Sequence, residues 1–221
     1  MLEVAPTDQA SDTRRRILDA AEQIFADFGY AASGMKMIAA EAGVAQASLH
    51  YHFESKEGLY EKVVERRTAA INSARRSALE GLVAQDRSND LEAILDALFR
   101  PALSPEAGGV NYARILAAMS SASKGRDVEL VRRYYDDIAH HFIEVMARAV
   151  PPHDRRAAAW AYSYSIGALV SQMAHTGRSE RLANEAPEQS DFEKRLRRLV
   201  RFCAAGIREV MVEEAESGAA N

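Results

Sequence analysis

The sequence is poor in cysteine and has no long apolar run. Cys203 is the one cysteine among 221 residues, which excludes an intrachain disulfide framework and a cysteine-clustered metal site. No apolar run reaches the roughly 18 residues that a membrane-spanning helix needs. The opening segment MLEVAPTDQASDTRRR lacks the apolar stretch of a secretory signal. We therefore expect a cytoplasmic chain without a membrane partner, in which Cys203 is a small buried hydrophobe on a helix.

Positive charge is also scarce. The formal net charge is −4, and residues 1–67 carry eight Lys and Arg against eleven Asp and Glu. A basic footprint is the usual first mark of a nucleic-acid-binding protein, so this composition argues against a generic nucleic-acid binder. Any binding of DNA has to come from the arrangement of particular residues.

Signatures of catalysis are absent as well. The sequence contains no phosphate loop, nucleophile elbow or zincin motif, and we expect no catalytic residues, no cofactor and no metal site. His141 and Asp137 lie four residues apart, beside His140 and Asp136, but no third ligand follows at a matching spacing. These four are expected to be exposed polar residues.

Helical periodicity runs through almost the whole chain, and no alternating strand pattern interrupts it. The first amphipathic helix begins near Thr13 and ends at Gly29. Ser33 and Ser55 are N-cap types ahead of a short second helix and a long fourth one, and a third helix covers about 45–51. The remaining periodic segments predict five further helices, at 91–103, 110–123, 128–149, 154–176 and 191–213. The expected fold class is all-α.

The stretch IAAEAGVAQASLHYHF, residues 38–53, is the most informative part of the sequence. Two steeply crossing helices need a small side chain where they approach, which Ala39 supplies. They also need a left-handed turn between them, which Gly43 takes without a Cβ clash. Val44 and Leu49 then anchor the second helix in the core. This spacing predicts a helix-turn-helix rather than an ordinary pair of packed helices.

The outward face of that second helix is rich in hydrogen-bonding groups. It carries Gln46, Ala47, Ser48, His50 and Tyr51, where a merely solvated helix would favour Lys and Glu. A helix with a buried stripe and such a face is typical of one that enters the major groove. These side chains predict double-stranded DNA as a partner.

The segments TRRRILDAAEQIFADFGY and MKMIAAEAGVAQASLHYHFESKEGLY resemble the N-terminal domain of the TetR/AcrR family of bacterial transcriptional regulators, from Thr13 to about Arg67. The resemblance implies an all-helical homodimer of nine or more helices that reads a palindromic operator through its third helix. It also implies a C-terminal core in which a small molecule binds and lowers operator affinity. We therefore expect a ligand-responsive repressor. The alternatives are an activator, or an all-α ligand-binding protein or enzyme without DNA binding.

The resemblance also assigns roles in DNA binding. Ser33 matches the residue that caps the second helix and meets a phosphate, and Ser48 is placed to touch a base or a phosphate. Tyr51 and His52 match positions that grip the DNA backbone, and Lys56 matches a lysine at the start of the fourth helix. Hydroxyls and imidazoles can bind phosphates without many lysines, which reconciles this assignment with the charge of the segment.

Some positions depart from the family pattern. Ala45 and Gln46 stand where the family often has Ser and Lys; Ala45 loses a side-chain cap, while Gln46 can pair bidentately with adenine. Gly34 and Ala47 are small enough to let the backbone approach the duplex. His50 replaces a common Tyr and can donate or accept a hydrogen bond. We expect these differences to change the operator sequence but not the docking mode.

The chain is expected to divide into a disordered tail (1–12), a helix-turn-helix domain (13–55), a helical ligand-binding and dimerisation domain (56–214) and a second disordered tail (215–221). Two stripes in the last two long helices predict a four-helix dimer interface, unless both are intramolecular core. One stripe contains Trp160, Ser163, Gly167, Val170, Ser171 and Ala174. The other contains Leu196, Leu199, Val200, Cys203, Ile207 and Val210.

Aromatic and methionine side chains gather in the middle helices and suit an apolar cavity between helices, although each taken alone fits a core position. The residues expected to bind a ligand there are Phe99, Tyr112, Met119, Tyr135, Phe142, Trp160 and Tyr164. This half of the chain is also similar to family members that sense fatty-acyl or other hydrophobic compounds. The expected effector is therefore small and hydrophobic, either fatty-acyl or aromatic.

Overall fold

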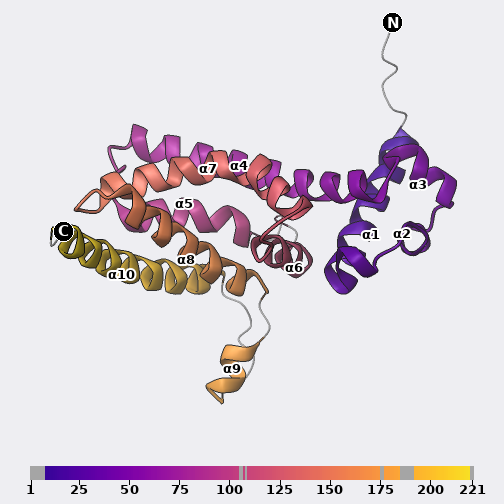
Figure 1. Ribbon diagram of the computed structural model, residues 1–221. Helices are drawn as coiled ribbons and strands as arrows, with labels where there is room; N and C mark the ends of the chain where they lie inside the picture. Colours follow the sequence, from indigo (N-terminus) through magenta and orange to yellow (C-terminus); the bar gives the residue numbers. More distant parts are fainter. Residues whose placement is uncertain (1–7, 105–106, 108, 175–176, 185–191, 220–221) are drawn as a thin grey trace, which may run out of the picture.

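A computed structural model describes residues 8–104, 107, 109–174, 177–184 and 192–219. Every regular element among these residues is a helix, in agreement with the predicted all-α class, and none of these helices is long and apolar enough to cross a membrane (Figure 1). The helices are α1 (Asp8–Ala32), α2 (Met35–Glu41), α3 (Gln46–Phe53), α4 (Lys56–Ala84), α5 (Leu91–Leu103), α6 (Gly109–Ser120), α7 (Arg126–Ala149), α8 (Arg155–Ala174), α9 (Arg178–Leu182) and α10 (Phe192–Ala219).

Several helix ends differ from the predicted ones. Helix α1 begins at Asp8, inside the predicted tail 1–12, and α10 runs to Ala219, inside the predicted tail 215–221; residues 1–7 and 220–221 lie outside the described part of the chain. Helix α9 was not predicted, because its five residues are too few to show a helical period. It lies apart from the other helices (Figure 1).

Helix α4 joins the two halves of the molecule. The Ser55 side chain accepts a hydrogen bond from the Gly58 amide at 3.0 Å, which confirms the predicted N-cap. The helix has 29 residues, a length of about 43 Å at the usual rise per residue. Its first turns pack on α1 beside α2 and α3, and the rest packs on α5 and α7 (Figure 1). One rigid element therefore belongs to both halves.

The C-terminal half is a bundle in which α8 lies at the centre of the contacts. It packs against α6, α7 and α10, and α10 packs in turn on α5. Cys203 of α10 is buried in this bundle, as predicted, and burial raises the pKa of its thiol.

Candidate DNA interface and ligand cavity

The turn between α2 and α3 has the geometry that its sequence predicts. Gly43 has a φ of 63°, and the Val44 amide donates to the Ala39 carbonyl at 3.0 Å. Ala39 is buried, and Leu49 of α3 is fully buried beneath the turn. These contacts fix the crossing of the two helices, because a larger side chain at Ala39 or a Cβ at Gly43 would be strained.

Arg16 of α1 fastens the same turn. Its Nη2 atom donates to the Ala42 carbonyl at 2.7 Å and to the Gly43 carbonyl at 3.0 Å. A Cβ placed on Gly43 would lie 3.0 Å from this nitrogen. Arg16 therefore satisfies the carbonyls that the end of α2 leaves open, a role that the sequence analysis did not find.

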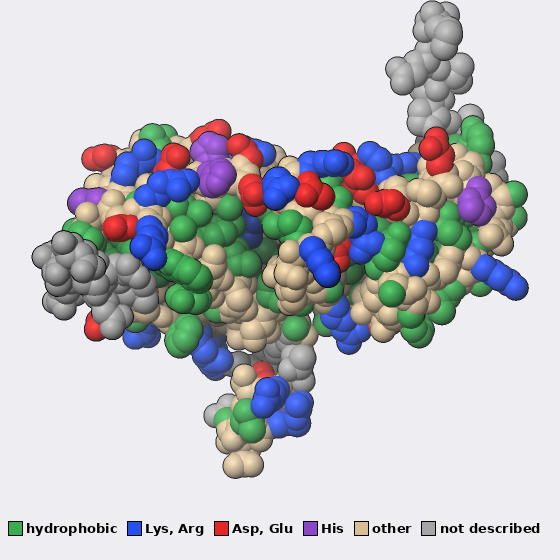
Figure 2. Space-filling model, in the orientation of Figure 1, with side chains coloured by type: hydrophobic (Ala, Val, Ile, Leu, Met, Phe, Trp, Pro, Cys, Tyr) green, Lys and Arg blue, Asp and Glu red, His purple; other side chains and the backbone are tan. Residues whose placement is uncertain are grey.

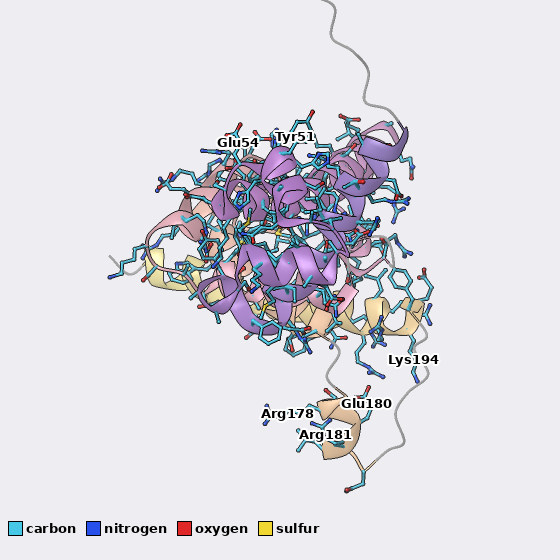
Figure 3. The ribbon with its side chains drawn as sticks, turned by 90° about the vertical axis from the view of Figure 1, so that its right-hand side faces the viewer. Tyr51, Glu54, Arg178, Glu180, Arg181 and Lys194 are labelled. Carbon is cyan, nitrogen blue, oxygen red and sulfur yellow. The ribbon has the colours of Figure 1, made fainter. Side chains whose placement is uncertain are left out.

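Helix α3 presents its polar side chains outward. Leu49 and Phe53 hold it in the core, whereas Tyr51 is 84% exposed and points away from the body of the protein (Figure 3). Gln46 and His50 are also exposed and stand one turn apart, with their Nε2 atoms 3.5 Å from each other. The remaining predicted contacts on this helix are exposed Ala47 and half-buried Ser48 and His52.

Ser33 does not cap α2. The N-cap is Gly34, which makes no side-chain cap, and the Ser33 hydroxyl is buried, where it donates to the Gly29 carbonyl at 2.6 Å. The reason is the end of α1: Gly29 leaves helical geometry with a φ of 71°, so its carbonyl takes the hydroxyl as a partner. The predicted phosphate contact of Ser33 would require this hydroxyl to turn from its present partner.

Lys56 lies where α1, α4 and α7 meet. Its Nζ atom is 4.3 Å from the centre of the Tyr30 ring, and the Arg126 guanidinium lies 3.4 Å from the same ring and 4.5 Å from the Tyr60 ring. Burial, and then the charge of Arg126, lower the pKa of the Lys56 ammonium. These cation–π contacts join the start of α7 to the helices that carry the helix-turn-helix.

Ion pairs with the C-terminal half explain part of the acidic balance of residues 1–67. Asp27 of α1 pairs with Arg114 of α6 at 2.7 Å, and Glu61 of α4 pairs with Arg133 of α7. Acidic and basic side chains accordingly alternate over α4 and α7 (Figure 2). Helix α3 contains no acidic residue, so the net charge of the segment is a poor guide to its outer face.

A cavity of about 460 Å³ lies between α6, α7 and α8. The face of the molecule drawn in Figure 2 has a hollow that is bordered by hydrophobic side chains. Most of its wall is apolar, formed by residues such as Leu116, Val131 and Ile166, and Tyr135 of the predicted ligand-binding set contributes to it. The volume is within the range of small-molecule sites, about 300–1,000 Å³.

The other predicted ligand-binding residues lie elsewhere. Four of them fill the core and do not line the cavity: Phe99, Tyr112, Met119 and Phe142. Trp160 and Tyr164 are instead 51% and 62% exposed, with ring centres 5.9 Å apart. An aromatic residue at helical spacing can fill a core, line a cavity or face outward, so a count of aromatic residues does not locate a pocket.

Arg75 of α4 is a charged residue in the wall of the cavity that the sequence analysis missed. Its side chain is 2% exposed, its Nε atom donates to the Leu98 carbonyl at 2.9 Å, and Nη1 lies 3.4 Å from Asn72 Oδ1. Burial lowers the pKa of its guanidinium. The signal was available: Arg75 follows the buried Ile71 by four residues and so falls on the inner face of the helix.

The two predicted dimer stripes differ in burial: the residues of the α8 stripe are exposed or half-buried, whereas those of the α10 stripe are buried where they are described. The stripe on α10 is packed inside the subunit: Leu196, Leu199, Val200, Cys203 and Ile207 are buried, and the Val210 side chain lies outside the described residues. This stripe is core, because α10 turns it toward α5 and α8. The outer face of α8 and α10 instead carries Trp160, Tyr164 and Phe202, and the last two line an apolar groove of about 390 Å³.

Comparison with known proteins identifies the family. A family model described as "Bacterial regulatory proteins, tetR family" matches residues 17–63. A second model, "Tetracyclin repressor-like, C-terminal domain", matches residues 92–206, which is more than half of the chain. The chain belongs to the TetR family. The resemblance inferred from residues 13–67 is thus confirmed and extends to the C-terminal half.

Similar TetR-family proteins include both an activator and a repressor of transcription. The transcriptional activator FasR of Mycolicibacterium smegmatis is 39% identical over 88 residues, which cover 40% of this chain and 39% of FasR. The transcriptional repressor KstR of Mycobacterium tuberculosis is 30% identical over 164 residues, which cover 73% of this chain and 67% of KstR. The chain spans about two fifths of the length of the first curated relatives it matches.

Solved TetR-family structures share the fold. The regulator PfmR of Thermus thermophilus matches with a TM-score of 0.61 at 19% identity, over 85% of this chain and 96% of that one. FadR of Bacillus subtilis, solved in complex with stearoyl-CoA, matches with a TM-score of 0.56 at 17% identity, over 87% and 98% of the two chains. At these identities the likeness concerns the fold alone.

Proposed function

We propose that this TetR-family chain is a homodimeric, ligand-responsive repressor that binds a palindromic operator and is released by a small hydrophobic effector. The observation that carries the proposal is α3, a helix anchored by Leu49 and Phe53 that exposes Gln46, His50 and Tyr51. A helix held in this way reads base edges in the major groove while its flanks contact phosphates. In this proposal residues 13–55 bind DNA, and residues 56–214 bind the ligand and the partner subunit.

The proposed division of labour on the DNA follows the exposure of each side chain. Gln46 and His50, one turn apart, face the base edges, and a glutamine amide matches adenine in the major groove. Tyr51 reaches a phosphate, and Ser48, His52 and Lys56 flank it. Gly34 and Ala47 leave room for the sugar-phosphate backbone, and Ser33 contributes only if its hydroxyl leaves the Gly29 carbonyl.

Dimerisation is proposed to use the outer face of α8 and α10. Trp160, Tyr164 and Phe202 expose a large aromatic surface there, which would favour burial against a second copy. Two recognition helices related by a two-fold axis are also what a palindromic operator requires.

The effector is proposed to act through the start of α7. The cavity is bounded by α6 and α7, and Arg126, the first residue of α7, stacks on Tyr30 and Tyr60. A ligand that displaces α7 would move these rings and with them α1 and α4. Release requires the ligand to bind the DNA-free arrangement more tightly. Fatty-acyl compounds are one class to try, because a fold neighbour was solved with stearoyl-CoA.

A gel shift with the DNA upstream of the gene tests the proposal. The full-length protein should shift this DNA with strong salt dependence, and Tyr51→Ala should weaken binding about tenfold, a loss of about 1.4 kcal/mol. Phe28→Ala is a matched control, because Phe28 is also an exposed aromatic residue but lies on α1. A reporter driven by the same DNA separates a repressor from an activator such as FasR. Salt-insensitive binding, or equal binding by Tyr51→Ala, would contradict the proposal.

A further inference from the structure

The Arg75 guanidinium is a buried cation without a buried anion. Within the part of the chain that the structure describes, it forms no ion pair; its contacts are a carbonyl and an amide oxygen. These two hydrogen bonds use two of the five N–H donors of a guanidinium. Buried charges in proteins are normally paired, whereas the remaining donors of Arg75 have no partner among the described residues.

These remaining donors belong to the wall of the cavity. Arg75 lines it from α4, and Tyr162 lines it from α8. The Tyr162 hydroxyl forms no hydrogen bond with the described residues, and burial raises its pKa, so it stays a protonated donor. A cation and a hydroxyl donor from two different helices thus border one space.

The rest of the wall limits what the space can hold. Leu116, Val131, Ile166 and Val170 make most of it apolar, which suits a hydrocarbon body. Asp136 is the one carboxylate among the lining residues of this cavity, and it forms no ion pair with Arg75. Its charge disfavours a ligand with more than one negative group.

We propose that this cavity binds a monocarboxylic acid with an apolar body, and that Arg75 pairs with the carboxylate while Tyr162 donates to it. The inference rests on the proposed ligand-responsive function and names the chemical class of its effector. A bidentate pair between a guanidinium and a carboxylate is short and strong in a low-dielectric site. An ester, amide or thioester of the same acid lacks the charge that Arg75 recognises.

A purely structural role for Arg75 is the competing explanation. The Nε atom alone holds the Leu98 carbonyl, and such a bond needs one neutral donor rather than a buried charge. If that were the whole role, the ligand preference of the cavity would not depend on the guanidinium. The two explanations therefore differ in selectivity between charged and neutral ligands.

The test compares decanoic acid with decanamide, which has nearly the same shape and no charge. Isothermal titration calorimetry on the full-length protein at neutral pH should give at least tenfold tighter binding of the acid. Arg75→Met removes the charge at similar length and should bring the two affinities within about threefold of each other. Arg76→Met is the matched control: Arg76 is the next residue, is exposed and pairs with Asp137, so its loss should leave the preference intact.

Two milder variants keep the test decisive if Arg75→Met does not fold. Tyr162→Phe should reduce the preference for the acid several-fold, and Asp136→Asn should strengthen binding of the acid without changing that of the amide. Equal binding of both probes by the wild-type protein, binding of neither, or an unchanged preference in all these variants would overturn the inference.

The same proteins separate this inference from the proposed function. If the protein binds the operator and both the acid and the amide release it equally well, the proposed repressor function is supported and the proposed role of Arg75 is contradicted. If the acid is preferred through Arg75 but no upstream DNA is bound, the ligand site stands and the DNA-binding proposal fails.

Discussion

Two buried charges lie at different points along α4, one packed against the helix and one on it, and only the first has an ion-pair partner among the described residues. Glu22 of α1 is 3% exposed and accepts from Arg66 Nη2 at 2.6 Å and from Arg67 Nε at 2.8 Å. Arg75, further along the helix, is as deeply buried and forms no ion pair with the described residues. The first arrangement ties α1 to α4 through ion pairs within the protein. In the second, the Arg75 guanidinium is left to pair with the carboxylate of the proposed ligand.

The largest expected effect comes from breaking the paired charge. Glu22→Ala removes the buried anion that Arg66 and Arg67 share, while Arg66 keeps its ion pair with Asp19 at 2.7 Å. The change should lower the free energy of unfolding by about 3 kcal/mol, the lower end for a buried pair, because both arginines reach solvent. Urea denaturation measures this loss. Glu65→Ala, which removes an exposed partner of Lys62 on the same helix, should cost less than about 1 kcal/mol. Equal losses in the two variants would show that burial of the pair is irrelevant.

Next in size is the contact between the two halves. Arg126→Met removes the cation from the Tyr30 and Tyr60 rings and should cost about 1.5 kcal/mol of stability. It should also weaken the coupling between effector and operator, measured as the ratio of operator affinities without and with decanoic acid. Arg132→Met, on an exposed site of the same helix, should leave this ratio unchanged. An unchanged ratio in Arg126→Met would show that the effector does not act on the operator-binding helices through the contact of Arg126 with Tyr30 and Tyr60.

Removing the unpaired charge should have the opposite sign to removing the paired one. Arg75→Met exchanges a buried cation for an apolar chain of similar length, so the free energy of unfolding should stay equal or rise by about 1 kcal/mol. Thermal and urea unfolding without ligand measure the change. A loss of more than about 2 kcal/mol in the free energy of unfolding would mean that Arg75, like Glu22, chiefly stabilises the fold.

The smallest effect concerns Asp90, a half-buried carboxylate near the distal end of α4. Hydrogen bonds from Arg87 and from the Ala93 amide lower the pKa of Asp90, the N-cap of α5. Its contribution is therefore complete above the unfolded-state pKa, near 3.8, and is lost as pH falls through the lower folded value. Asp90→Asn keeps a capping side chain and should change stability by less than about 0.5 kcal/mol at neutral pH, while flattening the pH dependence below that unfolded-state pKa. Urea unfolding across that range tests this.

The helix-turn-helix could be predicted because its determinants are local. Ala39, Gly43 and Leu49 fix the crossing within a short stretch of sequence, and the positive φ of Gly43 follows from its place alone. Ser33 shows the limit of local rules, since a distortion one turn earlier, at Gly29, gave its hydroxyl a different partner. The turn, but not every contact around it, was therefore readable from sequence.

The cavity could be predicted only in part, because its position depends on how distant helices pack. Tyr135 lines it, yet Phe142, further along the same helix, fills the core. Trp160 faces outward for the same reason: periodicity gives the face of a helix but not the element that covers it. Arg75 was more informative about the position of the cavity than the aromatic residues, because a charged side chain on a buried helix face needs a polar or charged partner.

The length of α4 gives it the properties of a lever. If its distal end is the pivot, a tilt of about 5° displaces the first turn by about 4 Å over a helix of about 43 Å. That displacement is close to one base-pair step of DNA, about 3.4 Å, and a symmetric partner would double it. A displacement of about 1 Å at Arg75 therefore need not be transmitted atom by atom, because the helix itself amplifies it into a mismatch of register with the operator.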